Sequence, residues 1–343
     1  MEPNEIKNIL NPIDDLWDSH NVPDTLTFSR WHGLGWREDG DELVISPFVT
    51  NQEDLTVVKK QIERVIGKNP NVKIKGLILP PFHEMTRGDQ KELNNPFQPG
   101  NVVGVSGSIC TGTIGAFLTS QKNGTKDTWL LSNHHILAEC SMKKIEVLGA
   151  GGVTLGTEVL PVPVSPWGNT VDAALVKITD TSKIDAVYAG LGRVTKPKTT
   201  AMPNLRRGTP ARKLGSATGV RFGRMALHCR RVKVFDCTDV LLREFRNQLT
   251  FISENPDLPF ADEGDSGSLV ISSARPIGLL FAKTIPPTSD QFQPPLFLVN
   301  PWNILMEHLL QIVKAPLELM LRNQRSASLD SVNRSFKYIS ELP

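Results

Sequence analysis

A short glycine-flanked segment around Ser266 is the part of this sequence best suited to chemistry. Residues 264–268 read Gly-Asp-Ser-Gly-Ser and lead into an apolar run. A serine hydroxyl becomes an effective nucleophile when a base takes its proton as it attacks. Glycines on both sides permit a tight turn, and the N–H groups of Gly264 and Ser266 would then form an oxyanion hole. An ordinary hairpin turn is the alternative interpretation.

The base that such a serine requires is predicted in a histidine pair, His134 and His135. The pair follows the apolar residues 129–131 through Ser132-Asn133 and leads into Ile-Leu-Ala. This pattern predicts a strand that runs into a turn or short helix, which is a firm mount for an imidazole. We expect surface or packing roles for the other histidines, which are His20, His32, His83, His228 and His308.

A carboxylate should fix the tautomer of that imidazole and stabilise its charged form. Asp172 is the best candidate, because it leads directly into Ala-Ala-Leu-Val at the start of an apolar strand. The alternative is that Asp172 is a turn or cap residue.

The segments that must position these side chains are mostly short strands. From residue 101 onward, strand-like runs are separated by Gly, Asn and Pro, at residues 115–119, 128–132, 145–148, 173–178, 249–253, 268–272 and 276–281. Many short strands with such punctuation indicate a mainly β sandwich or barrel. We find no internal repeat of the kind that marks a solenoid or propeller.

The first hundred residues have a different pattern. Residues 43–49 and 72–79 are predicted strands, and between them apolar residues recur at helical spacing, namely Leu55, Val58, Ile62 and Val65. Asn51 or Asp54 would cap this helix and Gly67 would end it. The segment before it carries only short helical hints, and another helix is predicted after Pro301.

Composition restricts the class of protein. A hydrophobic fraction of 39% and a charged fraction of 22% are typical of a folded chain. No apolar run approaches the roughly 18 residues of a membrane helix, and no secretory signal is visible at the N-terminus. The four cysteines form no CxxC pair, so we expect reduced thiols and a cytoplasmic or nuclear location, not secretion.

The net charge of +2 hides a basic block. Residues 190–235 contain twelve Lys or Arg and no Asp or Glu. The stretch from Arg193 to Lys233 could attract an acidic substrate, an acidic partner or nucleic acid. The alternative is a solvated barrel surface, and the scarcity of aromatic residues argues against a single-strand binder.

Three motifs together resemble the trypsin-like serine peptidases. They are Ser-Asn-His-His-Ile-Leu at residues 132–137, Val-Asp-Ala-Ala-Leu at 171–175, and the Gly-Asp-Ser-Gly-Ser segment, in the order His, Asp, Ser that this family has. An α/β-hydrolase would run Ser, acid, His, and would need glycine at Ser268. The family's Ser/Thr-x-x-His pattern implies that His135 is the base, with His134 as the fallback.

Further stretches resemble an intracellular branch of these peptidases that includes the plant narrow-leaf protein, among them residues 33–35, 111–115 and 213–219. The resemblance implies a chymotrypsin-like double β-barrel with the site between the barrels. We therefore expect an arm at residues 1–24, a small α/β module at 25–98, the peptidase domain at 99–310, and a tail, helical or flexible, at 311–343. One hypothesis is that the module covers or positions the cleft.

The resemblance also implies a substrate pocket that differs from that of trypsin. Phe260 stands where trypsin has its acid, and Phe281 and Lys283 fall on the opposite wall. These residues predict an apolar pocket with a lysine near its rim. A cleavage site that would free an N-terminus is not recognisable, so Asp265 is expected to need another partner.

The predicted activity is that of a serine endopeptidase with the triad His135, Asp172 and Ser266, an acyl-enzyme intermediate and a regulatory role. We expect a protein or peptide substrate, no cofactor, no metal site and no membrane, and the oligomeric state, a homo-oligomer included, stays open. Two alternatives are a weakly catalytic, peptidase-like binding module and a nucleic-acid-associated regulator.

Overall fold

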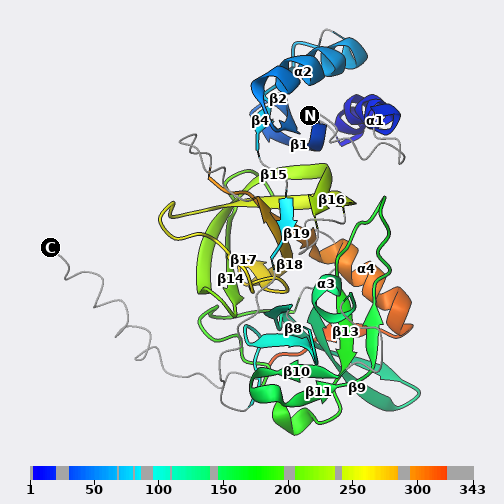
Figure 1. Ribbon diagram of the computed structural model, residues 1–343, viewed down its shortest axis with the longest axis vertical. Coiled ribbons are helices and arrows are strands. Elements are labelled where there is room, and N and C mark those ends of the chain that lie inside the picture. Colours follow the sequence, from blue (N-terminus) through cyan, green and yellow to red (C-terminus); the bar gives the residue numbers. More distant parts are fainter. Residues whose placement is uncertain are drawn as a thin grey trace, which may run out of the picture.

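The computed structural model describes residues 3–20, 31–67, 69–79, 82–85, 96–108, 110–139, 146–196, 205–235, 242–284 and 294–322. Two β-barrels follow one another along the long axis, and a small α/β module lies at the outer end of the second barrel (Figure 1). None of the described helices has the length and apolar character needed to cross a membrane.

The N-terminal module is built around a β-hairpin. Its elements are α1 (Pro3–His20), β1 (Trp31–Asp39), β2 (Glu42–Val49), α2 (Gln52–Ile66), β3 (Val72–Ile74) and β4 (Leu77–Ile78). Helix α2 begins after Asn51, whose side-chain oxygen accepts the N–H of Asp54 at 2.9 Å. It ends at Gly67, whose φ of 67° suits glycine. The predicted helix and both of its end signals are therefore observed.

Helix α1 joins the two short helical hints of the sequence into one helix. Ile6, Leu10, Ile13 and Trp17 recur at intervals of three or four residues, so they form one apolar face. That face belongs to a buried cluster with β1, β2 and α2. The segment expected to be an arm is thus packed on the module as far as it is described.

The first barrel is made of two sheets with a shared core. Its strands are β6 (Val102–Val105), β7 (Thr111–Thr113), β8 (Ala116–Lys122), β9 (Thr125–Ser132), β10 (Val147–Gly149), β11 (Thr154–Gly156), β12 (Val159–Pro161), β13 (Ala174–Lys177) and β20 (Leu317–Leu319). The sheet orders are β11-β10-β6-β7 and β12-β13-β9-β8-β20. Phe117, Leu130, Val147 and Val176 belong to a buried cluster that joins the two sheets.

The second barrel is a closed ring. Its strands are β14 (Pro210–Gly215), β15 (Gly219–Phe235), β16 (Leu242–Ser253), β17 (Leu269–Ser272), β18 (Arg275–Thr284) and β19 (Phe297–Pro301). They pair in the order β14-β17-β18-β19-β16-β15, and β15 pairs again with β14, which closes the ring. The inner face carries apolar side chains such as Met225, Phe251 and Val299.

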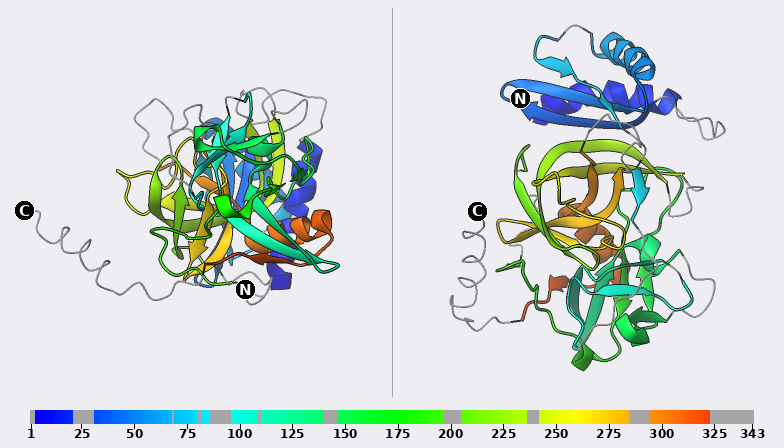
Figure 2. Two further views of the ribbon diagram at one scale, coloured as in Figure 1. Left: turned by 90° about the horizontal axis from the view of Figure 1, so that it is seen from below. Right: turned by 60° about the vertical axis from the view of Figure 1, so that its left-hand side comes forward.

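The module and the second barrel share one sheet. Strand β1 pairs with β15, with Gly33 opposite Val232, and the same sheet continues through β2. A further short strand, β5 (Phe82–Glu84), pairs with both β15 and β18. Figure 2 shows the hairpin of the module lying along the outer end of the second barrel. The module is thus attached through backbone hydrogen bonds as well as apolar packing.

Short helices complete the fold. They are α3 (His134–Leu137), the 3-10 turns η1 (Ala150–Gly152) and η2 (Thr181–Lys183), and α4 (Trp302–Val313), which packs with the first-barrel core through Leu305 and Leu309. The expected tail begins inside α4, and β20 beyond it pairs with β8. The predicted fold class, a mainly β double barrel with a small α/β module before it and a C-terminal helix after it, is confirmed.

Candidate active site

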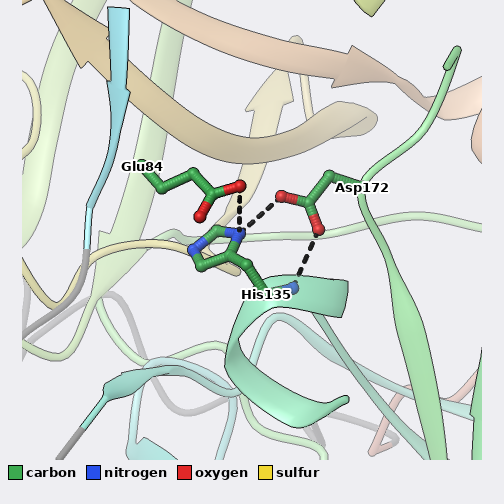
Figure 3. A group of neighbouring side chains, drawn as sticks. All are labelled: Glu84, His135 and Asp172. Carbon is green, nitrogen blue, oxygen red and sulfur yellow. Dashed lines mark hydrogen bonds and ion pairs between the residues drawn. The ribbon is translucent and has the colours of Figure 1, made fainter. Parts of the chain in front are cut away.

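His135 lies where strand β9 turns into α3 at the junction of the two barrels. Its Nδ1 atom is 2.5 Å from Oδ2 of Asp172, a hydrogen bond between two buried side chains (Figure 3). The turn is held by Ser132, whose hydroxyl donates to the carbonyl oxygen of Thr113 at 2.8 Å. The sequence-predicted histidine and acid are therefore brought together.

Asp172 is fixed by contacts from both barrels. Its backbone N–H donates to Oδ1 of Asn300 on β19 at 3.1 Å, and its carbonyl oxygen accepts from Nδ2 of Asn133 at 2.7 Å. Its Oδ1 atom accepts the N–H groups of His134 and His135 at 2.7 and 3.2 Å. The carboxylate thus binds the start of α3 as well as the imidazole ring.

His134, the fallback candidate, faces elsewhere. Its Nδ1 atom lies 2.9 Å from the carbonyl oxygen of Val162. Burial lowers its pKa below the ordinary value, although Asp172 opposes this effect. The geometry therefore favours His135 as the imidazole that works with Asp172.

The charges around His135 favour its protonated form. Burial by itself would disfavour a charged imidazole, but the carboxylates of Asp172 and Glu84 outweigh it and raise the pKa of His135. Burial likewise opposes ionisation of Asp172, and its interaction with His135 lowers the pKa of this acid below the ordinary value. An ionised acid beside the ring would stabilise an imidazolium formed during proton transfer.

Ser266 sits on a tight loop that packs against the support of His135. Gly264 and Gly267 both have φ of 92°, in the region that favours glycine. The carbonyl oxygen of Ser266 accepts from the N–H of Thr113 at 2.7 Å. A side chain at Gly112 would meet both Ile136 and the Ser266 carbonyl at 2.7 Å, so the loop and α3 approach each other across this glycine.

The Ser266 hydroxyl is not bonded to the imidazole in this arrangement. Its Oγ atom donates to the carbonyl oxygen of Phe281 at 3.1 Å. Nε2 of His135 is buried and has no hydrogen-bond partner within the described ranges. The side chains of Ser266 and His135 are 0% and 1% exposed as residues, so the site is closed to solvent.

The backbone of the serine loop leaves two donors available. Among the described residues, the N–H groups of Gly264 and Ser266 reach no acceptor, whereas the carbonyl oxygen of Gly264 accepts the hydroxyls of Thr113 and Ser216, each at 2.8 Å. Holding that carbonyl on the far side leaves the N–H groups for a ligand oxygen, as an oxyanion hole requires.

Asp265 has found its expected partner in Lys213 on β14. The Nζ atom of Lys213 is 2.6 Å from Oδ2 of Asp265, and both side chains are fully buried. The hydroxyl and N–H of Thr218 and the N–H of Ala217 also donate to this carboxylate. Burial lowers the pKa of Lys213, and Asp265 offsets part of this effect. The pair ties the serine loop to the barrel wall.

The three predicted pocket residues differ in their surroundings. Phe260 is fully buried and stacks with Phe251 and Phe297 at ring distances of 5.8 and 5.7 Å. Phe281 is also fully buried. Lys283 forms an ion pair with Asp262 at 2.5 Å. The two phenylalanines present no free surface here, so their role in a pocket stays a prediction.

Glu84 is the residue at this site that the sequence did not reveal. It comes from β5, and its Oε1 atom lies 3.9 Å from Nδ1 of His135, on the opposite side from Asp172 (Figure 3). Nη1 of Arg243 lies 3.3 Å from the same oxygen. A single acid in Phe-His-Glu-Met has no motif around it, so no sequence signal marked it.

Glu84, His135 and Asp172 could in principle offer a cation three ligand atoms, which lie within 4.8 Å of one another. Two ligands that share one zinc ion, each about 2 Å from it, stand about 3 Å apart. The contact of 2.5 Å between His135 and Asp172 is a direct hydrogen bond instead. This arrangement favours proton chemistry at the histidine.

The basic block is paired largely within the chain. Its ion pairs include Lys196–Glu318, Arg207–Asp39, Arg224–Glu254, Arg230–Asp14 and Arg231–Asp18. Two of these acids, Asp14 and Asp18, lie on α1. The Lys233 ammonium is 5.8 Å from the ring centre of Trp17. An external acidic partner stays a prediction.

Comparisons with known proteins give similarity in fold only. No protein-family model matches the chain, and no curated protein matches it. Among solved structures, a glutamic acid-specific serine protease covers 65% of this chain over its whole length, at 17% identity and a TM-score of 0.40. Protease A of Thermobifida fusca has the same identity and TM-score, covering 65% of this chain and 98% of its own length. Chymotrypsin of Cellulomonas bogoriensis covers 66% of this chain and 100% of its own length, at 18% identity and 0.39.

Proposed function

We propose that this chain is a serine endopeptidase with Ser266 as nucleophile, His135 as general base and Asp172 as the group that orients the histidine. The observation that carries the proposal is the buried hydrogen bond of 2.5 Å between His135 and Asp172, beside a glycine-flanked serine loop. The two free N–H groups of that loop support the same chemistry.

The proposed reaction is acyl transfer. His135 takes the proton of Ser266 at Nε2 while Oγ attacks the peptide carbonyl carbon, and Asp172 stabilises the imidazolium that results. The N–H groups of Gly264 and Ser266 donate to the oxyanion. The imidazolium then protonates the leaving amine. Water, deprotonated by the same imidazole, hydrolyses the acyl-enzyme and restores the serine.

Reaching the reactive state requires a small movement of one side chain. The Ser266 hydroxyl donates to Phe281 in the present arrangement, and a rotation about its Cα–Cβ bond would redirect it. Rotamer changes of this kind are fast compared with turnover. The Nε2 atom of His135 has no competing partner among the described residues, so it is available to accept the proton.

A fluorophosphonate probe tests the proposal directly. We expect covalent labelling of the wild-type chain that is abolished in Ser266→Ala and lowered by several orders of magnitude in His135→Ala, with the fold retained. Ser182→Ala, which changes an exposed serine of η2, serves as the matched control and should label normally. Labelling that survives in Ser266→Ala would contradict the assignment.

A peptidase-like binding module is the second candidate, favoured by the bond from Ser266 to Phe281 and by the closed site. Such a module would bind peptides without labelling or cleavage in any variant. A nucleic-acid-associated regulator requires steep salt dependence of DNA or RNA binding, and binding that is equal at low and physiological salt would exclude it. The regulatory role, the intracellular branch and the cytoplasmic or nuclear location stay predictions.

A further inference from the structure

Strand β5 extends along the part of β18 that β17 leaves open. Strand β17 pairs with the first half of β18, from Leu279 back to Arg275. Strand β5 pairs with the second half in the same antiparallel sense, with Glu84 opposite Ala282, His83 opposite Lys283 and Phe82 opposite Thr284. The two strands therefore run in the same direction along one edge, and the serine loop lies between them.

The end of β5 meets the nucleophile at a shared acceptor. The N–H of Met85 donates to the carbonyl oxygen of Phe281 at 3.4 Å, and the Ser266 hydroxyl donates to the same oxygen at 3.1 Å. The neighbouring residue, Glu84, places its carboxylate beside the ring of His135 (Figure 3). The backbone that leads out of β5 is thus aimed at the triad.

The side chain of Met85 fills the region where a substrate pocket was predicted. Met85 is 0% exposed and belongs to the same buried cluster as Phe260, Ala261 and Leu280. A methionine side chain is unbranched and adapts to an irregular apolar space. The burial of Phe260 is therefore accounted for by a residue of the chain's own N-terminal part.

An extended peptide that binds at an open strand edge gains main-chain hydrogen bonds, and pockets take its side chains. Given the proposed function, on which this inference rests, the substrate must approach Ser266 along the free half of β18. We propose that residues Phe82–Met85 occupy this substrate edge as a built-in inhibitor, with Met85 in the specificity pocket and Glu84 against the catalytic histidine.

The occupant also indicates the substrate class. A substrate that replaces it would be an extended peptide with a long apolar side chain, such as Met, at the residue whose carbonyl is attacked. An acidic residue before it would lie between His135 and Arg243, as Glu84 does. Release need not unfold the strand, because Phe82 and His83 also pair with Val234 and Phe235 of β15.

The first experiment tests occupancy without catalysis. In the full chain carrying Ser266→Ala, the additional change Met85→Asp puts a charge into the apolar pocket and should expel the segment. Fluorescence anisotropy would then measure binding of a labelled acetyl-Phe-His-Glu-Met-amide peptide. We expect at least tenfold tighter binding to the double variant than to Ser266→Ala alone. Equal binding by two folded proteins would overturn the proposal.

The second experiment measures reactivity in the chain with Ser266 intact. Met85→Asp should raise the rate of fluorophosphonate labelling by about tenfold or more, whereas Met85→Leu should keep the block. Val65→Asp adds the same charge at an exposed position of α2 and should label at the wild-type rate. If Met85→Asp does not fold, as judged by circular dichroism, Met85→Gly carries both comparisons.

The two measurements separate the two failures. Tighter peptide binding by the Met85 variants with no labelling of any variant would keep the occupied edge and refute the peptidase. Brisk Ser266-dependent labelling of the wild type, with no gain in rate or in peptide binding on changing Met85, would keep the peptidase and refute the built-in inhibitor.

Discussion

The imidazole of His135 lies between two carboxylates and one guanidinium. Asp172 and Glu84 approach its Nδ1 atom from two sides, His134 precedes it on α3, and Arg243 lies beyond Glu84. Asp172 makes the short hydrogen bond and is itself held by Asn133 and Asn300. These contacts assign the orienting role to Asp172 and leave Glu84 with an electrostatic one.

Replacing Asp172 by asparagine should nearly abolish turnover. An amide N–H facing Nδ1 would favour the tautomer that carries its proton on Nε2, which cannot accept the proton of Ser266. The expected loss in kcat is on the order of 10⁴-fold, measured on a peptide substrate. Thr170→Ala, two residues away, is a control for local packing. A loss of less than about tenfold in Asp172→Asn would contradict the assignment.

The pH dependence of Ser266 labelling should reflect the raised pKa of His135. The neutral imidazole is the base, so the labelling rate should rise with pH and reach half its maximum above the ordinary pKa of 6.5. Glu84→Gln removes one carboxylate that favours the imidazolium, so the midpoint should fall toward more acidic pH. Glu318→Gln, at an exposed residue, is the control. A midpoint unchanged in Glu84→Gln would contradict this account.

At the scale of elements, the serine loop is held by a strand rather than by a chain terminus. Lys213 on β14 and Asp265 in the loop form a fully buried pair, and Gly215 has no space for a side chain, because a Cβ there would lie 2.1 Å from Asp265. The loop therefore takes its conformation from contacts within the folded barrel.

Lys213→Met should destabilise the fold by about 3–5 kcal/mol, because it leaves the Asp265 carboxylate buried without its counter-ion. Denaturant unfolding monitored by fluorescence would measure this change. Removing both charges in Lys213→Met with Asp265→Asn should recover part of the loss. If the single variant were as stable as wild type, the ion pair would not be needed to hold the loop.

Strand β15 is the largest element that the sequence did not predict. Its core-facing positions, such as Met225, Leu227 and Cys229, alternate with Arg224, His228 and Arg230. The basic side chains drew attention to net charge and hid the alternation with a period of two residues. Pairing with β14, β16 and β1 gives this strand the partners that a long amphipathic strand requires.

At the scale of the molecule, the module and the second barrel share a core. Phe48, Leu79 and Phe82 belong to one buried cluster with Val232, Val234 and Phe281 of the barrel. Removing the module would therefore expose apolar barrel surface and the edge of β15. This favours a structural role for the module in addition to any restraint of the cleft.

A chain that lacks residues 1–95 should lose solubility rather than gain activity. An uncovered apolar surface and an open strand edge both favour aggregation. Size-exclusion chromatography of the soluble fraction, with the full chain as reference, would measure this. A soluble, monomeric truncation that labels faster than the full chain would show instead that the module only restrains the site.

The sequence by itself determined the local features of this protein. The glycines around Ser266, the helical spacing and caps of α2, and the apolar runs of β9, β13 and β18 are encoded within a few neighbouring residues. Local sterics and burial suffice to produce such elements. The order of the three candidate catalytic residues and the mainly β class followed from the same information.

Only the tertiary structure decided which distant groups meet. Glu84 beside His135, Lys213 beneath Asp265 and Met85 in the region of Phe260 each join segments far apart in the chain, and none lies in a motif. Such contacts arise from the closure of barrels and the pairing of strand edges, which no local pattern specifies. They determine whether the serine loop is held in place and whether the cleft is free for a substrate.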